Sequence, residues 1–208
     1  MKKAIIVSFE GIDGCGKSTQ AKKFVNYLRK NNFDTLFFRE PGTTKIGKKL
    51  RKILLSKNDD ISFFTELLLY LAARNELVEK KILPEIFKKK IIVLDRFIDS
   101  TLAYQGYGRK LPLEFIEKAH QIILRGIKPD LTFVIDSPAC ELKTAIGKNP
   151  DRLEKSLKFQ ERVRKGYKTI ATEEPERVKI VKRKSIEQTF KQILDIWNEF
   201  LDEHQGNY

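Results

Sequence analysis

Gly11-Ile12-Asp13-Gly14-Cys15-Gly16-Lys17-Ser18-Thr19 has the spacing of a phosphate-binding loop: Gly, four residues, then Gly-Lys-Ser. The apolar residues 4–9 precede it and are typical of a buried parallel strand. Residues 17–31 follow with apolar side chains at helical spacing. A glycine turn before a helix also occurs by chance. Strand, loop and helix in this order are the context in which the motif binds phosphate, and they predict an α/β fold.

The chemistry expected of this loop comes from its backbone. Glycines let successive N–H groups turn inward around an anion, and the helix N-terminus adds donors and partial positive charge. Lys17 would reach the β- and γ-phosphates, and the Ser18 hydroxyl would ligate Mg²⁺. We therefore expect a nucleoside triphosphate to bind here, with its phosphates against Gly11, Asp13, Gly14, Cys15, Gly16, Lys17, Ser18 and Thr19.

Composition narrows the class of protein. The 208 residues suit one domain, and the net charge of +13 favours anionic partners. A lysine-rich solvated surface explains that charge better than nucleic-acid binding, because the basic residues are spread along the chain and no nucleic-acid module is recognisable. Two cysteines and two distant histidines give no zinc spacing. With no signal-peptide pattern and no apolar run of ~18 residues, we expect a cytoplasmic protein without a membrane span.

Four further apolar runs predict strands at residues 35–38, 91–96, 131–135 and 178–181. Helical patterns alternate with them at residues 46–55, 63–87, 113–124, 140–147, 151–171 and 185–201. The pattern over 63–87 is interrupted near Pro84, and its expected apolar stripe is Phe64, Leu67, Leu68, Leu71 and Ala72. We predict a P-loop NTPase-type fold over residues 1–208, with a five-stranded parallel sheet and helices on both faces. Residues 143–155, rich in cations, are expected to form a flap, although a solvated turn between helices explains the same composition equally well.

Polar residues follow the second and third predicted strands, at the edge where open α/β sheets bind ligands. Arg39 is a candidate phosphate ligand, although a surface arginine fits its spacing equally well. Tyr70 and Arg74 lie one helical turn apart and could hold a base and a phosphate, or lie at the edge of the core. Asp95 ends a strand and could hold Mg²⁺ through water, with Arg96 beside it.

The Gln105 amide has a donor and an acceptor, and can read a pyrimidine edge carrying both N–H and C=O. An ordinary helix end explains the same residue.

Five stretches occur in this order along the chain: residues 9–20, Arg39-Glu40-Pro41-Gly42-Thr43, Ala72-Ala73-Arg74, Asp95-Arg96-Phe97 and Ser100-Thr101-Leu102-Ala103-Tyr104-Gln105-Gly106. Together they resemble thymidylate kinases, the nucleoside monophosphate kinases that make dTDP from dTMP and ATP. The phosphate loop alone identifies only a large superfamily, whereas Asp-Arg followed by Ala-Tyr-Gln-Gly is much narrower.

The resemblance implies a role for each matching residue. Those expected to bind dTMP are Asp13 at the 3′-hydroxyl, Arg39 and Arg74 at the phosphate, Tyr70 stacked on thymine, Arg96 between the two phosphates, Ser100 and Gln105 facing the base, and Tyr104 at the deoxyribose. It also implies a cis Glu40–Pro41 bond, a homodimer, and a place in dTTP biosynthesis. The implied catalytic residues are Lys17, Arg96 and a flap cation. Gly14 stands where some members carry an arginine, so Arg152 is the candidate flap cation and Lys148 the second.

Two other functions fit parts of the sequence. A different nucleotide kinase would keep the loop and change the base-reading residues. A GTPase-like binding module would need Asn-Lys-x-Asp to read guanine, and residues 57–60 carry such residues only in the wrong order.

Overall fold

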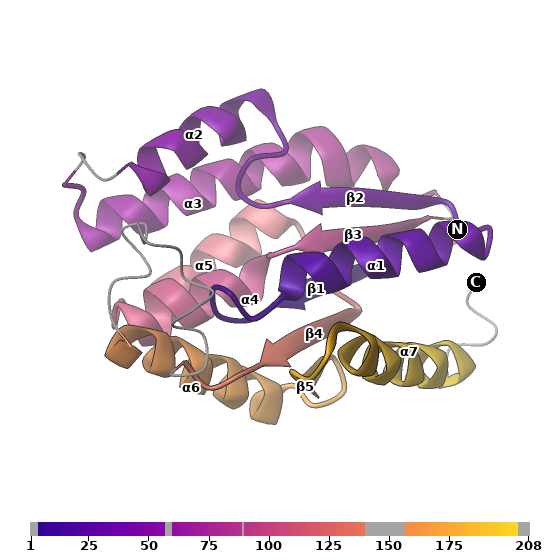
Figure 1. Ribbon diagram of the computed structural model, residues 1–208. Helices are drawn as coiled ribbons and strands as arrows, with labels where there is room; N and C mark the ends of the chain where they lie inside the picture. Colours follow the sequence, from indigo (N-terminus) through magenta and orange to yellow (C-terminus); the bar gives the residue numbers. More distant parts are fainter. Residues whose placement is uncertain (1–3, 57–59, 89, 140–156, 204–208) are drawn as a thin grey trace.

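The computed structural model describes residues 4–56, 60–88, 90–139 and 157–203 (Figure 1). Within them, one parallel sheet has the strand order β2-β3-β1-β4-β5. The strands are β1 (Ile5–Glu10), β2 (Thr35–Arg39), β3 (Ile91–Asp95), β4 (Leu131–Asp136) and β5 (Val178–Lys182). The predicted α/β fold with a five-stranded parallel sheet is confirmed. Strand β3 ends before Arg96, contrary to the predicted range, because Arg96 has a left-handed φ of 73° that breaks the extended backbone.

The α-helices alternate with the strands along the chain, as predicted. They are α1 (Lys17–Lys30), α2 (Lys45–Leu55), α3 (Phe63–Leu77), α4 (Ile98–Thr101), α5 (Leu113–Leu124), α6 (Leu157–Glu173) and α7 (Ile186–Glu203). Two π-helical segments, η1 (Val78–Ile82) and η3 (Leu102–Gly108), continue α3 and α4, and the 3₁₀ segment η2 (Leu83–Glu85) contains Pro84. The helix predicted at 140–147, the flap at 143–155 and Lys148 and Arg152 lie outside the described residues.

Alternating residues of β1 divide the core into two layers. Ile5, Val7 and Phe9 belong to a cluster with residues of α1, α6 and α7, where the Phe24 and Trp197 rings lie edge to face at 5.2 Å. Ala4 and Ile6 face a second cluster that includes η1 and the end of α5. Because successive strand residues point to opposite faces, a strand that is buried at every position requires cover on both sides. Figure 1 shows α1 and α7 on one face of the sheet and α3 and α5 on the other.

The apolar stripe predicted for α3 is wrong in part. Leu67 and Leu71 are buried against Ile116, but Phe64 and Leu68 are 42% and 46% exposed, and Ala72 is also exposed. The buried face of α3 instead carries Glu66, Ala73 and Arg74. Polar contacts to neighbouring elements override the apolar pattern here. No helix in the described ranges is long and apolar enough to span a membrane.

Candidate active site

The loops after β1, β2 and β3 meet at the carboxyl edge of the sheet. Asp95 is in register with Phe9 on one side and Arg39 on the other. Beyond the strands, the Arg96 N–H donates to the Phe9 carbonyl at 3.0 Å, and the Glu40 N–H donates to the Asp95 carbonyl at 3.0 Å. Strand register therefore brings together residues that are far apart in the sequence.

The phosphate loop has the backbone shape that its glycines allow. Gly11, Gly14 and Gly16 have φ values of 135°, 79° and 93°, which side chains strongly disfavour. A Cβ on Gly11 would also lie 2.7 Å from the Ile135 carbonyl oxygen. Gly16 is the N-cap of α1 and offers no side-chain cap, and the first turn carries no acidic residue. This helix terminus is thus suited to an anion.

Two side chains of the loop are held inside it. Lys17 is buried, and its Nζ donates to the Ile12 carbonyl at 3.4 Å and lies 3.5 Å from an Asp13 oxygen. Cys15 is also buried, and burial raises the pKa of its thiol, so it fills space as an uncharged group. Ser18 and Thr19 lie in the first turn of α1.

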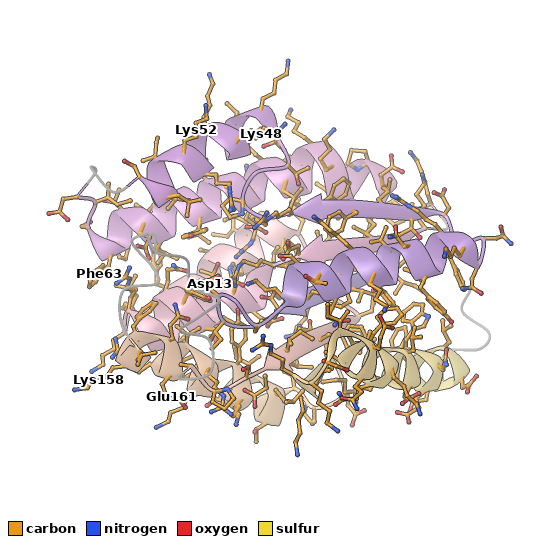
Figure 2. The ribbon with its side chains drawn as sticks, in the orientation of Figure 1. Asp13, Lys48, Lys52, Phe63, Lys158 and Glu161 are labelled. Atoms are coloured by element: carbon orange, nitrogen blue, oxygen red, sulfur yellow. The ribbon has the colours of Figure 1, made fainter. Side chains whose placement is uncertain are left out.

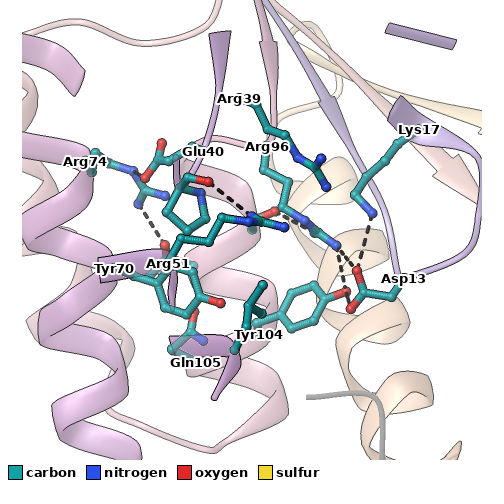
Figure 3. A pocket seen from close by; sticks show the side chains of 14 residues that line it. Asp13, Lys17, Arg39, Glu40, Arg51, Tyr70, Arg74, Arg96, Tyr104 and Gln105 are labelled. Atoms are coloured by element: carbon teal, nitrogen blue, oxygen red, sulfur yellow. Dashed lines mark hydrogen bonds and ion pairs between the residues drawn. The ribbon is translucent and has the colours of Figure 1, made fainter. Parts of the chain in front are cut away.

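A pocket of about 630 Å³, including its open mouth, lies beside this loop (Figure 3). All eight residues predicted to bind dTMP line it, together with Lys17. The full lining is Asp13, Lys17, Arg39, Glu40, Pro41, Arg51, Leu55, Tyr70, Arg74, Arg96, Ser100, Thr101, Tyr104 and Gln105.

Arg96 connects the pocket to the phosphate loop. Its Nη1 donates to the Gly11 carbonyl at 3.1 Å and to Ser100 Oγ at 3.0 Å, while Nη2 contacts Asp13 and the Tyr104 hydroxyl. Burial alone would raise the pKa of Asp13, but the charges of Arg96 and Lys17 hold it well below its usual range. Asp13 is therefore a carboxylate, and its second oxygen accepts from Tyr104 at 2.8 Å.

Arg74 is committed to protein contacts. Nη1 lies 2.7 Å from both Thr101 Oγ1 and His120 Nε2, and Nη2 donates to the Phe97 carbonyl at 2.9 Å. Burial and the Arg74 charge lower the pKa of His120 to about 2, so its neutral ring accepts this bond. His120 is thus a structural partner of Arg74.

Glu40 lies beside Arg74 as a buried carboxyl group. Arg74 Nε is 2.8 Å from a Glu40 oxygen, within ion-pair range but not at a hydrogen-bonding angle. Burial raises the pKa of Glu40 despite the Arg74 charge. The Glu40–Pro41 bond is cis, as the resemblance implied. Arg74 has little Nη donor capacity left for a ligand, because three of its four Nη hydrogens already face protein acceptors.

Sequence reasoning missed Arg51, which lies on α2 and donates from Nη1 to the Pro41 carbonyl at 3.1 Å. Burial, and then the charge of Arg39, lower its pKa. Lys48 and Lys52 on the same helix point away from the protein (Figure 2), whereas Arg51 reaches into the pocket (Figure 3). A single arginine in a helix otherwise rich in lysine was the available signal, since arginine is favoured for phosphate recognition.

The predicted metal ligands Ser18 and Asp95 belong to different elements of this edge. Asp95 is buried at the end of β3, with its Oδ2 3.5 Å from Arg39 Nε. Among the described residues, no three His, Cys, Asp or Glu side chains gather closely enough to form a metal site. A hydroxyl and a carboxylate are nevertheless the hard oxygen donors that Mg²⁺ prefers, and Mg²⁺ commonly takes its remaining ligands from phosphates and water. The donor set fits an ion that enters with a nucleotide.

A phosphate loop on a parallel sheet, with a cationic pocket at the same edge, defines a P-loop nucleotide kinase. The thymidylate kinase family model matches residues 9–193. A thymidylate kinase of Thermoanaerobacter sp. (strain X514) is 46% identical over 96% of this chain and 100% of its own length. The thymidylate kinase of Kosmotoga olearia is 39% identical over 91% of this chain and 93% of its own. The crystal structure of thymidylate kinase from Ehrlichia chaffeensis, 32% identical, aligns with a TM-score of 0.79 over 93% of this chain and 98% of its own. The chain belongs to the thymidylate kinase family.

Proposed function

We propose that this protein phosphorylates dTMP to dTDP with ATP, as a step in dTTP biosynthesis. The observation that carries the proposal is the pocket beside the phosphate loop, which combines arginines with Tyr70 and Gln105. The cations suit a nucleotide phosphate, and the aromatic ring and the amide suit a pyrimidine. The family relatives, all named thymidylate kinases, support this choice of base.

The reaction requires positioning more than acid–base chemistry. The dTMP phosphate is already anionic at neutral pH, so no strong general base is needed. The protein must align two polyanions and neutralise their repulsion. We assign this task to Arg96, which lies between the phosphate loop and the pocket, and to Lys17, which would leave its long contacts to the loop for the ATP phosphates.

The dTMP molecule would lie across the pocket with its phosphate toward Arg39 and Arg96. The Arg39 side chain is 57% exposed and its Nε lies 3.5 Å from Asp95 Oδ2, so it is able to turn. The deoxyribose would contact Asp13 and Tyr104. The thymine ring would stack on Tyr70 and face Ser100 and Gln105, and Arg74 would contribute mainly by fixing the pocket wall.

Mg²⁺ would be held by the Ser18 hydroxyl and, through water, by Asp95. It would offset negative charge on the transferring phosphoryl group. We further propose that residues 1–208 work as one kinase domain, with residues 143–155 as a flap that supplies Arg152.

We also propose a homodimer located in the cytoplasm. Phe64 and Leu68 on α3 and Phe115 on α5 are exposed by 38–46%, and the Phe64 and Phe115 rings are 5.0 Å apart. Such an apolar surface suits a second copy of the chain. Light scattering after size-exclusion chromatography should give twice the 24.2 kDa chain mass, and Phe64→Lys should shift it toward the monomer. A monomeric wild type contradicts the dimer.

The function is tested by following ADP formation with ATP–Mg²⁺ and each of dTMP, dUMP, dCMP, dAMP and dGMP. We expect rapid turnover of dTMP and slower turnover of dUMP, because one methyl group is worth only ~1–3 kcal/mol. Arg96→Ala should lower kcat by about 10³-fold or more. Arg29→Ala, on α1 away from the pocket, is the matched control and should keep wild-type rates. Faster turnover of another monophosphate would overturn the base assignment, and turnover of none would overturn the proposed reaction.

A further inference from the structure

A buried carboxylate lies directly behind the base-reading residues. Glu66 is on α3, one turn before Tyr70, and its side chain is fully buried. Its Oε1 accepts from Gln105 Nε2 at 3.0 Å and from Arg109 Nε at 3.3 Å, and its Oε2 accepts from Arg109 Nη2 at 3.1 Å. Glu66 therefore joins the pocket residue Gln105 to a cation outside the pocket lining.

Arg109 holds this carboxylate in place. Its guanidinium lies over the Phe63 ring at 4.3 Å and the Phe159 ring at 4.6 Å. The Arg109 guanidinium is therefore held in one orientation, donates to Glu66 through two nitrogens and offsets the negative charge of Glu66. In this ion pair both Glu66 oxygens accept hydrogen bonds, and a carboxylate donates none.

The orientation of the Gln105 amide follows from this contact. Because Glu66 can only accept hydrogen bonds, Gln105 must point its Nε2 toward Glu66. The reversed amide would place Gln105 Oε1 against the Glu66 carboxylate oxygens. Both side chains are buried, with Gln105 only 2% exposed, so water cannot relieve that repulsion. The backbone carbonyl of Gln105 accepts from the Leu111 N–H at 3.1 Å, which fixes the backbone at this residue. One N–H and Oε1 then remain for a ligand.

We propose, on the basis of the proposed function, that Glu66 determines the preference for thymine over cytosine by fixing the Gln105 amide in one orientation. Thymine presents an N3–H donor beside a C4 carbonyl, so Oε1 and the remaining N–H of Gln105 match it. Cytosine presents an N3 acceptor beside an amino donor, which is the reverse pattern. Cytosine would therefore need the Gln105 amide in the reversed orientation, which Glu66 excludes. Uracil has the thymine pattern, so Glu66 does not affect the choice between dTMP and dUMP.

The decisive variant is Glu66→Gln, which keeps the side-chain shape but adds a donor, so that either orientation of Gln105 can be satisfied. We expect the ratio of kcat/KM for dCMP to that for dTMP to rise at least about tenfold, while the dUMP to dTMP ratio stays constant. Glu66→Asp keeps an acceptor-only group and should retain the wild-type ratio even where total activity falls. Glu79→Gln, which removes the partner of Arg125 farther along the same helical segment, should change neither ratio.

An unchanged dCMP to dTMP ratio in a folded Glu66→Gln protein overturns the inference, as does an equal rise in Glu66→Asp. Should Glu66→Gln fail to fold, calorimetric titration of the wild type provides the test. Tight binding of dTMP and dUMP, with weak binding of dCMP and of N3-methylated dTMP, supports the fixed amide, and equal binding of all four contradicts it. Wild-type turnover of dTMP is measured first and tests the proposed function separately, so failure of the two ideas gives different results.

Discussion

Glu10 should make the stability of this protein fall as the pH rises toward neutrality. It ends β1 and is fully buried behind the active site. Its Oε1 accepts from the Phe97 N–H at 2.7 Å, and its Oε2 accepts from Ser100 and from the Tyr167 hydroxyl at 3.2 Å. Burial, together with the charge of Asp99, raises the pKa of Glu10 from 4.5 to about 7. We predict that Glu10→Gln, which resembles the protonated acid, removes this pH dependence.

The sign follows from where the proton is held. Between pH 4.5 and about 7 the folded protein keeps the Glu10 proton, while the unfolded chain releases it. The stabilising contribution is complete below pH 4.5 and is lost as the pH rises through 7. At about 1.4 kcal/mol per pH unit, the difference amounts to about 3 kcal/mol at most. Relative to wild type, Glu10→Gln should therefore gain stability with rising pH, with most of the gain complete by pH 8.

Urea unfolding of both proteins at pH 5, 6, 7 and 8 measures this difference. We expect the free energies of unfolding to lie close together at pH 5 and to separate by about 1–3 kcal/mol at pH 8, with the variant more stable. Glu114→Gln changes an exposed carboxylate paired with Lys118 and should follow the wild type at every pH. A constant difference between Glu10→Gln and wild type, or one that grows toward acid, would refute the reasoning.

Arg51→Met should raise the KM for dTMP by about tenfold or more with little change in kcat, because it removes a cation that lines the pocket and would attract the substrate phosphate. Initial rates over a range of dTMP concentrations test this, and an unchanged KM contradicts it. Gly166→Ala should destabilise the protein by about 1–3 kcal/mol in urea, because the added Cβ would lie 2.7 Å from Tyr107 Cβ. Lys165→Ala, an exposed neighbour on α6, should change stability by less than about 0.5 kcal/mol, and an equal loss in both variants contradicts the steric explanation.

The sequence predicts the three central strands β3, β1 and β4 well because they are buried on both faces and are therefore largely apolar. The edge strands β2 and β5 are partly exposed but still contain short apolar runs. Strand β1 with its glycine loop specifies where the sheet would bind phosphate. The gathering of Arg39, Tyr70, Arg74 and Arg96 at this edge is predictable for a related reason, whereas the roles expected of Asp13, Ser100 and Tyr104 are implied by the resemblance. The first four residues follow strands or sit one turn apart on α3, and parallel strands place their carboxyl ends at one edge.

Residues behind the pocket are not predictable in this way. Glu66 has a helical spacing that fits the solvent-facing side of α3, and its burial depends on Arg109, 43 positions later. Glu10 contacts Tyr167 across 157 positions of sequence. No local sequence pattern predicts such partners, because each contact depends on how α6 and η3 pack onto the sheet. The same packing changes the buried face of α3 in part, since Leu67 and Leu71 are buried while Phe64 and Leu68 remain exposed.

The pocket arginines differ in how firmly the protein holds them. Arg74 is buried, with contacts of 2.7–2.9 Å to Thr101, His120 and the Phe97 carbonyl, so moving it toward a ligand would leave buried groups without partners. Arg39 is largely exposed and has a 3.5 Å contact, so little is lost when it turns toward a phosphate. The first kind of arginine fixes the shape of the pocket, and we propose that the second turns toward the substrate phosphate. A kinase that must both select a base and admit a polyanion needs both kinds in one pocket.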